Sequence, residues 1–170
     1  MGAEGVSGVR TVIGVMGSGR PLRGAALAVA RRTGELIAGR GWVLLTGGRA
    51  AGVMDAASRG AREAGGLVVG VLPDADAAGA SAHLDIAIRT GMGDARNAIN
   101  ALSSDVIIAL PGGAGTLSEV ALALKAGKTV IALGWDPGAA MRSAGPGRLL
   151  DAATPDEAIA LVANVLGGAR

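Results

Sequence analysis

Residues 106–119 read VIIALPGGAGTLSE, and we expect the rest of the chain to be arranged around this stretch. An apolar, β-branched run ends at Pro111, a glycine-rich turn follows, and a helical pattern begins at Thr116. The turn contains Gly112, Gly113 and Gly115. Glycine lets a backbone approach a ligand closely, and the free N–H groups of a helix start attract anions. A strand, turn and helix of this kind can therefore hold a phosphate group.

Two further turns of the same type occur earlier in the chain. GVMGSG follows the start of the apolar run 11–15, and TGGRAAG follows the run 42–45. The candidate contacts in these turns are Gly17, Ser18, Gly19, Arg20, Thr46, Gly47, Gly48 and Arg49. Such turns also join strands to helices by tight packing, which is the alternative interpretation. In an open parallel sheet, however, the ligand crevice lies beyond the carboxyl ends of the strands, so three such turns can converge on one phosphorylated small molecule.

Apolar runs and helical periodicities alternate along the whole chain. Strands are expected at residues 11–15, 42–46, 67–72, 84–88, 106–110 and 129–133. Helices are expected after Pro21, over 53–64 and 95–102, from Thr116 to Gly127, and at the end of the chain. This alternation predicts an α/β protein, a single-domain Rossmann-like open parallel sheet of six or seven strands with helices on both faces.

The connections complete this outline. Residues 1–10 are expected to be a flexible leader, and residues 11–170 to be one ligand-binding domain. Residues 73–83 and 134–147 are expected to be loops. The last helix should begin with a capping box formed by Thr154 and Glu157.

The composition excludes several kinds of protein. The 170 residues include no Cys and one His, which excludes a disulfide framework and a thiolate site, and no protein-ligated metal is expected. The net charge is +2 and no aromatic side chain accompanies the basic pair Arg31 and Arg32, so nucleic acid is not an expected partner. No apolar run spans a membrane and no signal sequence is present, which predicts a cytoplasmic protein without a membrane partner.

Glu119 permits two interpretations. In the first, Thr116 and Glu119 form a capping box and satisfy each other's free N–H groups, and the local sequence alone favours this interpretation. In the second, the Glu119 carboxylate faces a sugar phosphate, where it takes a proton from water or stabilises positive charge on a ribose ring.

Arg96 stands in the first turn of its expected helix, where the helix dipole makes a cation unfavourable. An anionic ligand gripped by the guanidinium group would account for this position. A surface ion pair with Asp94 is the alternative. Asn97 and Asn100 on the same helix are candidates to hydrogen-bond a heterocycle or ribose, or else are exposed polar residues.

The segment PGGAGTLSE, together with GVMGSG and the TGG turn at Thr46, resembles the PGGxGTxxE signature of the lysine-decarboxylase-like family, also called the Lonely Guy family. The resemblance covers nearly the whole chain and implies a Rossmann-type fold. Enzymes of this family hydrolyse cytokinin nucleoside 5'-monophosphates to the free base and ribose 5-phosphate. For that activity the resemblance implies that Arg96 and Glu119 are catalytic.

The arginine helix departs from the pattern of these enzymes. They favour Met-x-x-Arg-Lys, whereas here Asn97 replaces the lysine and Met92 lies one place too far from Arg96. The run TGMGDARNAIN is instead similar to the branch that includes molybdenum cofactor carrier proteins. Those proteins bind the cofactor, a molybdopterin with a terminal phosphate, and protect it from oxidation before passing it on.

This second resemblance implies a carrier without catalytic residues, with molybdenum cofactor as its ligand. It also implies a homo-oligomer, a tetramer, with molybdoenzymes as recipients of the cofactor. Combined with the turns, it predicts a binding site made of Gly17, Ser18, Gly19, Thr46, Gly47, Gly48, Arg96, Asn97, Gly112, Gly113, Gly115, Thr116 and Glu119. A phosphoribohydrolase is the alternative function, and a nucleotide-binding regulator is a third.

Overall fold

Seven parallel strands form one sheet in the structure, a computed structural model that describes residues 8–168. The strands are β1 (Val12–Met16), β2 (Val43–Thr46), β3 (Val68–Leu72), β4 (Ile86–Arg89), β5 (Val106–Ala109), β6 (Thr129–Leu133) and β7 (Leu149–Ala152). Their order in the sheet is β4-β3-β2-β1-β5-β6-β7. The predicted fold class is confirmed, with the seventh strand at one edge. Most of the expected leader, residues 1–10, falls outside the described residues.

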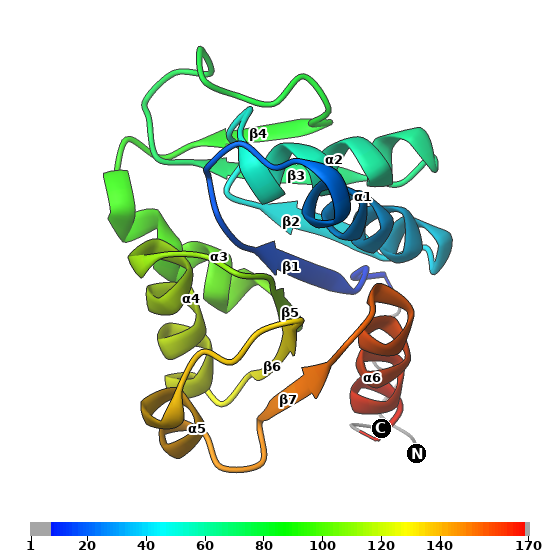
Figure 1. Ribbon diagram of the computed structural model, residues 1–170. Coiled ribbons are helices and arrows are strands. Elements are labelled where there is room, and N and C mark those ends of the chain that lie inside the picture. The colour runs from blue at the N-terminus through cyan, green and yellow to red at the C-terminus, as the bar shows by residue number, and fades with distance from the viewer. Residues whose placement is uncertain (1–7, 169–170) are drawn as a thin grey trace, which may run out of the picture.

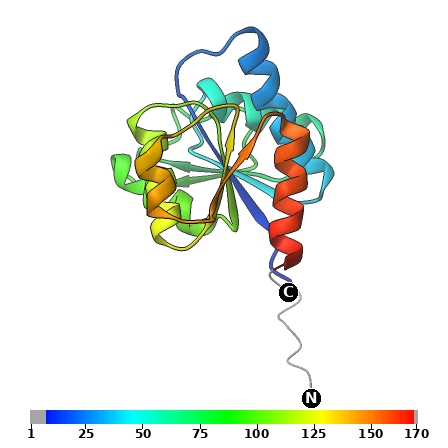
Figure 2. The ribbon, with the colours of Figure 1, turned by 60° about the horizontal axis from the view of Figure 1, so that its bottom comes forward.

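Helices cover both faces of this sheet. They are α1 (Gly24–Gly39), α2 (Gly52–Glu63), the short 3-10 helix η1 (Gly93–Ala95), α3 (Arg96–Ser103), α4 (Ala114–Lys125), α5 (Ala139–Ala144) and α6 (Pro155–Gly168). Figure 1 shows α1, α2 and α6 on one side of the strands and α3, α4 and α5 on the other. The turned view of Figure 2 keeps this division, with α6 in red and α5 in orange on opposite sides.

Alternate residues of the central strands point into the two helical layers. In β1, Ile13 and Val15 belong to the core beneath α1, α2 and α6, whereas Met16 belongs to the core beneath α3 and α4. In β5, Ile108 and Ile107 divide in the same way. All five side chains are buried. Because both faces of the sheet are covered, the strands appear in the sequence as continuous apolar runs.

Glycine brings the consecutive helices α1 and α2 into backbone contact. A Cβ atom added to Gly34 of α1 would lie 1.9 Å from the Ala57 carbonyl oxygen of α2. One added to Gly60 of α2 would lie 2.0 Å from the Arg31 carbonyl oxygen of α1. The helices therefore cross at a distance that only glycine permits.

The centre of the sheet is a topological switch point. From β1 the chain continues to β2, β3 and β4 on one side, and from β5 it continues to β6 and β7 on the other. The turns that follow β1 and β5 therefore lie together and then diverge, which opens a crevice between them. The backbone N–H of Ser18 donates to the Pro111 carbonyl oxygen at 3.1 Å and ties the two turns together.

Helix α4 begins two residues earlier than the sequence pattern predicted. Gly113 occupies the N-cap position, and no side chain caps the helix. The capping box between Thr116 and Glu119 is therefore wrong, because both residues lie inside the helix and are buried. Glycine is well tolerated at an N-cap, so the helix can start at Ala114 without the cap that the local sequence offered.

The C-terminal part of the chain tests two further predictions. The expected loop 134–147 contains the short helix α5, and there Asp136 pairs with Arg142 at 3.0 Å. The capping box of α6 is present, since the Glu157 N–H donates to Thr154 Oγ1 at 3.2 Å. The Glu157 carboxylate accepts from the Ala153 N–H at 2.8 Å, one residue before the expected donor.

Candidate functional site

A cavity of about 300 Å³ opens at the switch point, among the turns after β1, β2 and β5. Its wall is formed by Val15, Met16, Gly17, Ser18, Gly19, Arg20, Gly47, Met54, Asp94, Arg96, Asn97, Gly113, Gly115, Thr116 and Glu119. The structure thus brings most of the predicted site residues together. Thr46, Gly48 and Gly112 do not line the cavity, and the contact of each predicted residue with a ligand stays a prediction.

The start of α4 presents free backbone to this cavity. A Cβ atom added to Gly113 would meet nothing within 4 Å, and one added to Gly115 would meet only Asn97 Nδ2, at 4.0 Å. Neither glycine has a positive φ. Gly112 differs, because a Cβ there would lie 2.1 Å from Thr116 Oγ1. Packing therefore explains the glycine at 112, whereas at 113 and 115 the missing side chains leave open space beside an uncapped helix start.

The turn after β2 is shaped mainly by internal contacts. The Thr46 side chain is fully buried, and its Oγ1 accepts a hydrogen bond from the Gly48 N–H at 3.0 Å. Gly48 has a φ of +76°, and an added Cβ would lie 3.0 Å from the Gly70 Cα. Thr46 and Gly48 therefore hold the turn in shape, and of the four candidates in this turn only Gly47 lines the cavity.

The Ser18 side chain closes the turn after β1. Its Oγ accepts a hydrogen bond from the Arg20 N–H at 3.0 Å. The Ser18 carbonyl oxygen accepts from the Val53 N–H at 2.8 Å, which attaches this turn to the start of α2. Because a hydroxyl that accepts one bond still has a proton to donate, Ser18 keeps a donor for an anion in the cavity.

Arg96 is buried, with 8% of its surface exposed, and connects two strand ends. Its Nη1 donates to the Gly47 and Val71 carbonyl oxygens, each at 2.6 Å. The alternative of a surface ion pair with Asp94 is wrong. Burial lowers the pKa of the Arg96 guanidinium, and the charge of Glu119 opposes this shift. Within residues 8–168 the Nε of Arg96 is buried without a hydrogen-bond partner.

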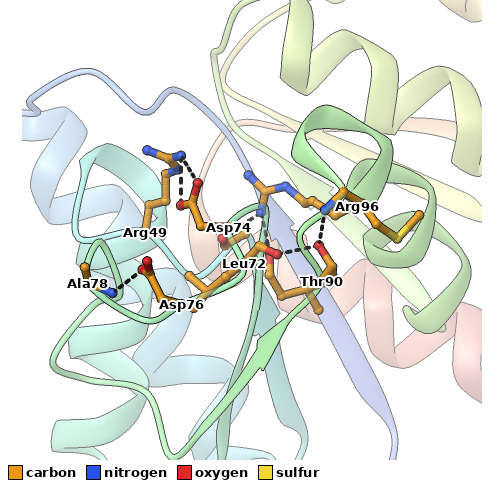
Figure 3. A network of polar contacts seen from close by, with 10 residues as sticks. Arg49, Leu72, Asp74, Asp76, Ala78, Thr90 and Arg96 are labelled. Atoms are coloured by element: carbon orange, nitrogen blue, oxygen red, sulfur yellow. Dashed lines mark hydrogen bonds and ion pairs between the residues drawn. The ribbon is translucent and has the colours of Figure 1, made fainter.

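A second arginine stands at the outer side of this group. Arg49 pairs with Asp74 at 3.1 Å, and both side chains are about half exposed. In Figure 3 the Asp74 carboxylate lies between the guanidinium groups of Arg49 and Arg96. Arg49 is therefore neutralised by a partner from the 73–83 loop. Asp76 in the same loop accepts from the Ala78 N–H at 2.9 Å, as expected for a turn residue.

Glu119 lies deep in the wall, with 7% of its surface exposed. Its Oε1 accepts a hydrogen bond from Asn100 Nδ2 at 2.7 Å. Burial raises the pKa of the Glu119 carboxyl, while the Asn100 hydrogen bond and the charge of Arg96 lower it. The neutral acid is thus favoured relative to an exposed glutamate.

Two asparagines hold α3 against the start of α4. Asn97 Nδ2 donates to Ser118 Oγ at 2.9 Å, and Ser118 Oγ donates to the Gly115 carbonyl oxygen at 2.6 Å. Asn100 is fully buried, and its Oδ1 has no hydrogen-bond partner among the described residues. The alternative that these asparagines are exposed polar residues is wrong.

The sequence did not single out Met54 or Asp94 as site residues. Met54 occupies the helical face of α2 that an ordinary core residue would occupy, and Asp94 precedes Arg96 in an irregular turn. Neither position carries a local signal, because each reaches the cavity only through the packing of α2 and η1. In the described part of the chain, no cluster of three or more His, Cys, Asp or Glu could hold a metal ion. No helix there is long and apolar enough to cross a membrane.

An open parallel sheet with a cavity at its switch point places this protein in the class of Rossmann-like α/β domains. Within that class, the SLOG cluster4 family model matches residues 10–159, and the chain belongs to this family.

Solved structures give a closer comparison. The molybdenum cofactor binding protein of Rippkaea orientalis is 47% identical, with a TM-score of 0.90, over 94% of this chain and 99% of that one. The molybdenum cofactor carrier protein of Chlamydomonas reinhardtii is 48% identical, with a TM-score of 0.87 and the same coverage. Close structural neighbours of this protein are therefore molybdenum cofactor carriers.

A relative found by sequence similarity is an enzyme. The cytokinin riboside 5'-monophosphate phosphoribohydrolase of Mycobacterium tuberculosis is 38% identical over 109 residues. The match covers 59% of this chain and 54% of the enzyme. The resemblance to the Lonely Guy family and to its carrier branch is thus confirmed.

Proposed function

We propose that this protein binds molybdenum cofactor and carries it without changing it chemically. The observation that carries the proposal is the pair Gly113 and Gly115, which face the cavity with no packing or conformational reason to be glycine. They stand at the uncapped start of α4, where free N–H groups attract an anion. The identities of 47% and 48% to cofactor-binding neighbours support this choice of ligand.

The donors present fit a ligand with a terminal phosphate. The N–H groups of the first turn of α4 and the Ser18 hydroxyl would hold the phosphate. Arg96 would add positive charge, because only its Nη1 is engaged by carbonyl oxygens. The molybdenum centre would remain bonded to its own pterin, since no cysteine is available to replace those ligands.

The hydrogen bonds of Glu119 and Arg96 suit a fixed binding wall. Glu119 Oε1 is held by Asn100 Nδ2 at 2.7 Å. The Arg96 guanidinium is fixed to the ends of β2 and β3. Both groups are thus held by the fold in a way that suits a rigid binding wall.

Anaerobic equilibrium binding of molybdenum cofactor to the purified protein tests this proposal. We expect the cofactor to bind at least about tenfold more tightly than AMP, a difference of about 1.4 kcal/mol. Gly115→Ala and Arg96→Ala should both weaken binding, with Gly39→Ala as a remote control. The bound cofactor should also be recovered intact after incubation. Equal or tighter binding of AMP would contradict the proposal.

The alternative is hydrolysis of a nucleoside 5'-monophosphate. The relationship to the Mycobacterium tuberculosis enzyme favours it, together with the presence of both Arg96 and Glu119 on the cavity wall. Release of ribose 5-phosphate that Glu119→Ala abolishes would establish this activity. Nucleotide binding without turnover would point instead to a regulator.

We further propose that the carrier is a cytoplasmic homotetramer that delivers the cofactor to molybdoenzymes. A groove of about 300 Å³ on the outer face of α3 and α4 supports an oligomer. It is lined by Ala98, Leu102, Leu122, Lys125 and Ala126. Leu102 is 61% exposed there, which is unusual for a large apolar side chain. Light scattering should give the mass of four chains, and Leu102→Glu should lower it.

A further inference from the structure

The cavity offers little apolar surface to the ring system of a ligand. The chain has no Phe or Tyr, and neither Trp42 nor Trp135 lines the cavity. The apolar side chains on the wall are those of Val15, Met16 and Met54. Val15 and Met16 are 0% and 1% exposed, so their surfaces are occupied by the core. Met54 is half-buried and is therefore the apolar side chain that a ligand can cover.

Two glycines lie beside the Met54 thioether, and Gly47 leaves it the space that a Cβ atom would take. A Cβ atom added to Gly47 would lie 2.7 Å from Met54 Sδ, and one added to Gly19 would lie 3.5 Å from Met54 Cε. The side chain thus extends between the turn after β1 and the turn after β2. It reaches this place from the first turn of α2, whose Val53 N–H is bonded to Ser18.

Arg96 occupies the other part of the space beside Gly47. The same added Cβ would lie 2.3 Å from Arg96 Nη1, so guanidinium and thioether are neighbours over this glycine. A flat aromatic heterocycle suits such a surface, because the Met54 sulfur makes favourable contacts with aromatic rings and the Arg96 guanidinium supplies positive charge beside it. An anion alone would need the start of α4 and would gain nothing from Met54.

We propose that Met54 is the residue that packs against the ring of the bound ligand and so separates heterocyclic phosphates from simple sugar phosphates. The inference rests on the proposed function, since it assumes that the α4 start holds the phosphate. It adds that ring recognition comes from a thioether beside Gly19 and Gly47, in a cavity without aromatic side chains.

Binding of three defined probes to Met54 variants tests this assignment. The probes are neopterin monophosphate and AMP, which carry an aromatic ring system, and ribose 5-phosphate, which carries none. We expect Met54→Ala to weaken both ring-bearing probes by about 5- to 10-fold and to change ribose 5-phosphate by less than about twofold. Met54→Leu, which keeps an apolar side chain of similar volume, should retain most of the ring preference.

A spectroscopic signature separates ring contact from a loss of folding. Packing against Met54 should alter the absorbance of the pterin ring on binding. This change should be absent when the Met54→Ala variant is saturated with neopterin monophosphate. Thermal unfolding of each variant checks that the fold is intact. The assignment is overturned if Met54→Ala weakens all three probes equally, or if it weakens none.

Gly115→Ala distinguishes failure of this inference from failure of the proposed function. A methyl group at the phosphate end should weaken all three probes together. If Gly115→Ala has this effect and Met54→Ala does not discriminate, the phosphate site stands and the role of Met54 is overturned. If wild-type protein binds none of the probes, the assignment of Met54 is overturned, whereas the proposed function is decided separately by the binding of molybdenum cofactor itself.

Discussion

The turns after β2 and β5 share a sequence pattern but differ in what surrounds their glycines. After β2, Gly48 is held in a left-handed conformation and Gly47 makes room for Arg96 and Met54. After β5, Gly113 and Gly115 have ordinary backbone angles and open space around them. One turn uses glycine to let the protein pack against itself, and the other leaves backbone N–H groups accessible to something else.

This difference shows how a glycine-rich turn can be assigned to packing or to binding. Where an added Cβ would strike a neighbour, the fold itself demands glycine. Where it would enter a cavity, packing does not require glycine, and access for a ligand is the remaining explanation. The comparison can be tested one residue at a time, and the expected effects decrease in the order given below.

The largest effect is expected from Gly48→Ala in the turn after β2. The substitution forces a left-handed conformation on alanine, and the added methyl lies 2.9 Å from Leu72 Cδ2 and 3.0 Å from the Gly70 Cα. The free energy of unfolding should fall by about 2–4 kcal/mol, as measured by urea denaturation. Gly65→Ala is the control, because Gly65 has the same φ of +76° with nothing within 4 Å. Equal losses in the two variants would show that packing contributes nothing.

The second prediction concerns the arginine that fills the space beside Gly47. Arg96→Met leaves the Gly47 and Val71 carbonyl oxygens without their donor, so the free energy of unfolding should fall by about 1–3 kcal/mol. Arg49→Met removes an exposed ion pair with Asp74 and should cost less than about 1 kcal/mol. A larger loss for Arg49→Met would refute the structural role assigned to Arg96.

In the turn after β5, the free energy of unfolding and the affinity for a ligand should change in opposite directions. Gly115→Ala replaces glycine by the best helix former at an open position, so unfolding should cost up to about 1 kcal/mol more. The methyl group enters the cavity, however, and phosphate ligands should bind about tenfold more weakly, a loss of about 1.4 kcal/mol. Gly39→Ala, at an open helical position in α1, should raise stability without affecting binding. Unchanged affinity in Gly115→Ala would remove Gly115 from the site.

The smallest effect concerns Glu119 on the cavity wall, and the way the free energy of unfolding depends on pH. Burial raises the pKa of Glu119 above its ordinary value of 4.5, so between these two values the folded state holds a proton that the unfolded state releases. The contribution of Glu119 to stability is full below pH 4.5 and is lost as the pH rises through the raised pKa. Glu119→Gln should remove this decline, as measured by urea denaturation over a pH series.

Glu63→Gln supplies the control of opposite sign. Hydrogen bonds from Arg59 and Arg31 lower the pKa of Glu63, so its contribution is present above pH 4.5 and is lost as the pH falls through the lowered pKa. The slope of the free energy of unfolding against pH should therefore differ from wild type above pH 4.5 in Glu119→Gln and below pH 4.5 in Glu63→Gln. The same pH profile for both would contradict the buried state of Glu119.

Sequence periodicity was sufficient for the fold, since the apolar run 129–133 is β6 and the run 67–72 contains the whole of β3. It was insufficient for α4. The sequence predicted a helix start with a capping box at Thr116, but the helix begins at Ala114 and both Thr116 and Glu119 are buried. Local sequence cannot weigh tertiary burial against a cap worth about 1 kcal/mol.

The site was predictable only where a local motif marked it. Glycines at 112 and 113 look alike in sequence, yet one packs on Thr116 and the other faces the cavity. Arg96 was recognisable from its helix position, but its acceptors lie 49 and 25 residues away in the chain. Met54 gave no signal at all, because its role depends on the distance between two turns that only the folded sheet brings together.

The scarcity of aromatic residues gives the protein a built-in optical reporter. Of its two tryptophans, Trp135 donates from its indole N–H to the Ala109 carbonyl oxygen at 2.8 Å, at the end of β5 that leads into the binding turn. Trp42 directly precedes β2, at the amino ends of the strands, with Arg40 over its ring. With no tyrosine in the chain, its ultraviolet emission comes from these two indoles alone, and a Trp42→Phe variant would leave the indole beside this turn as the single emitter.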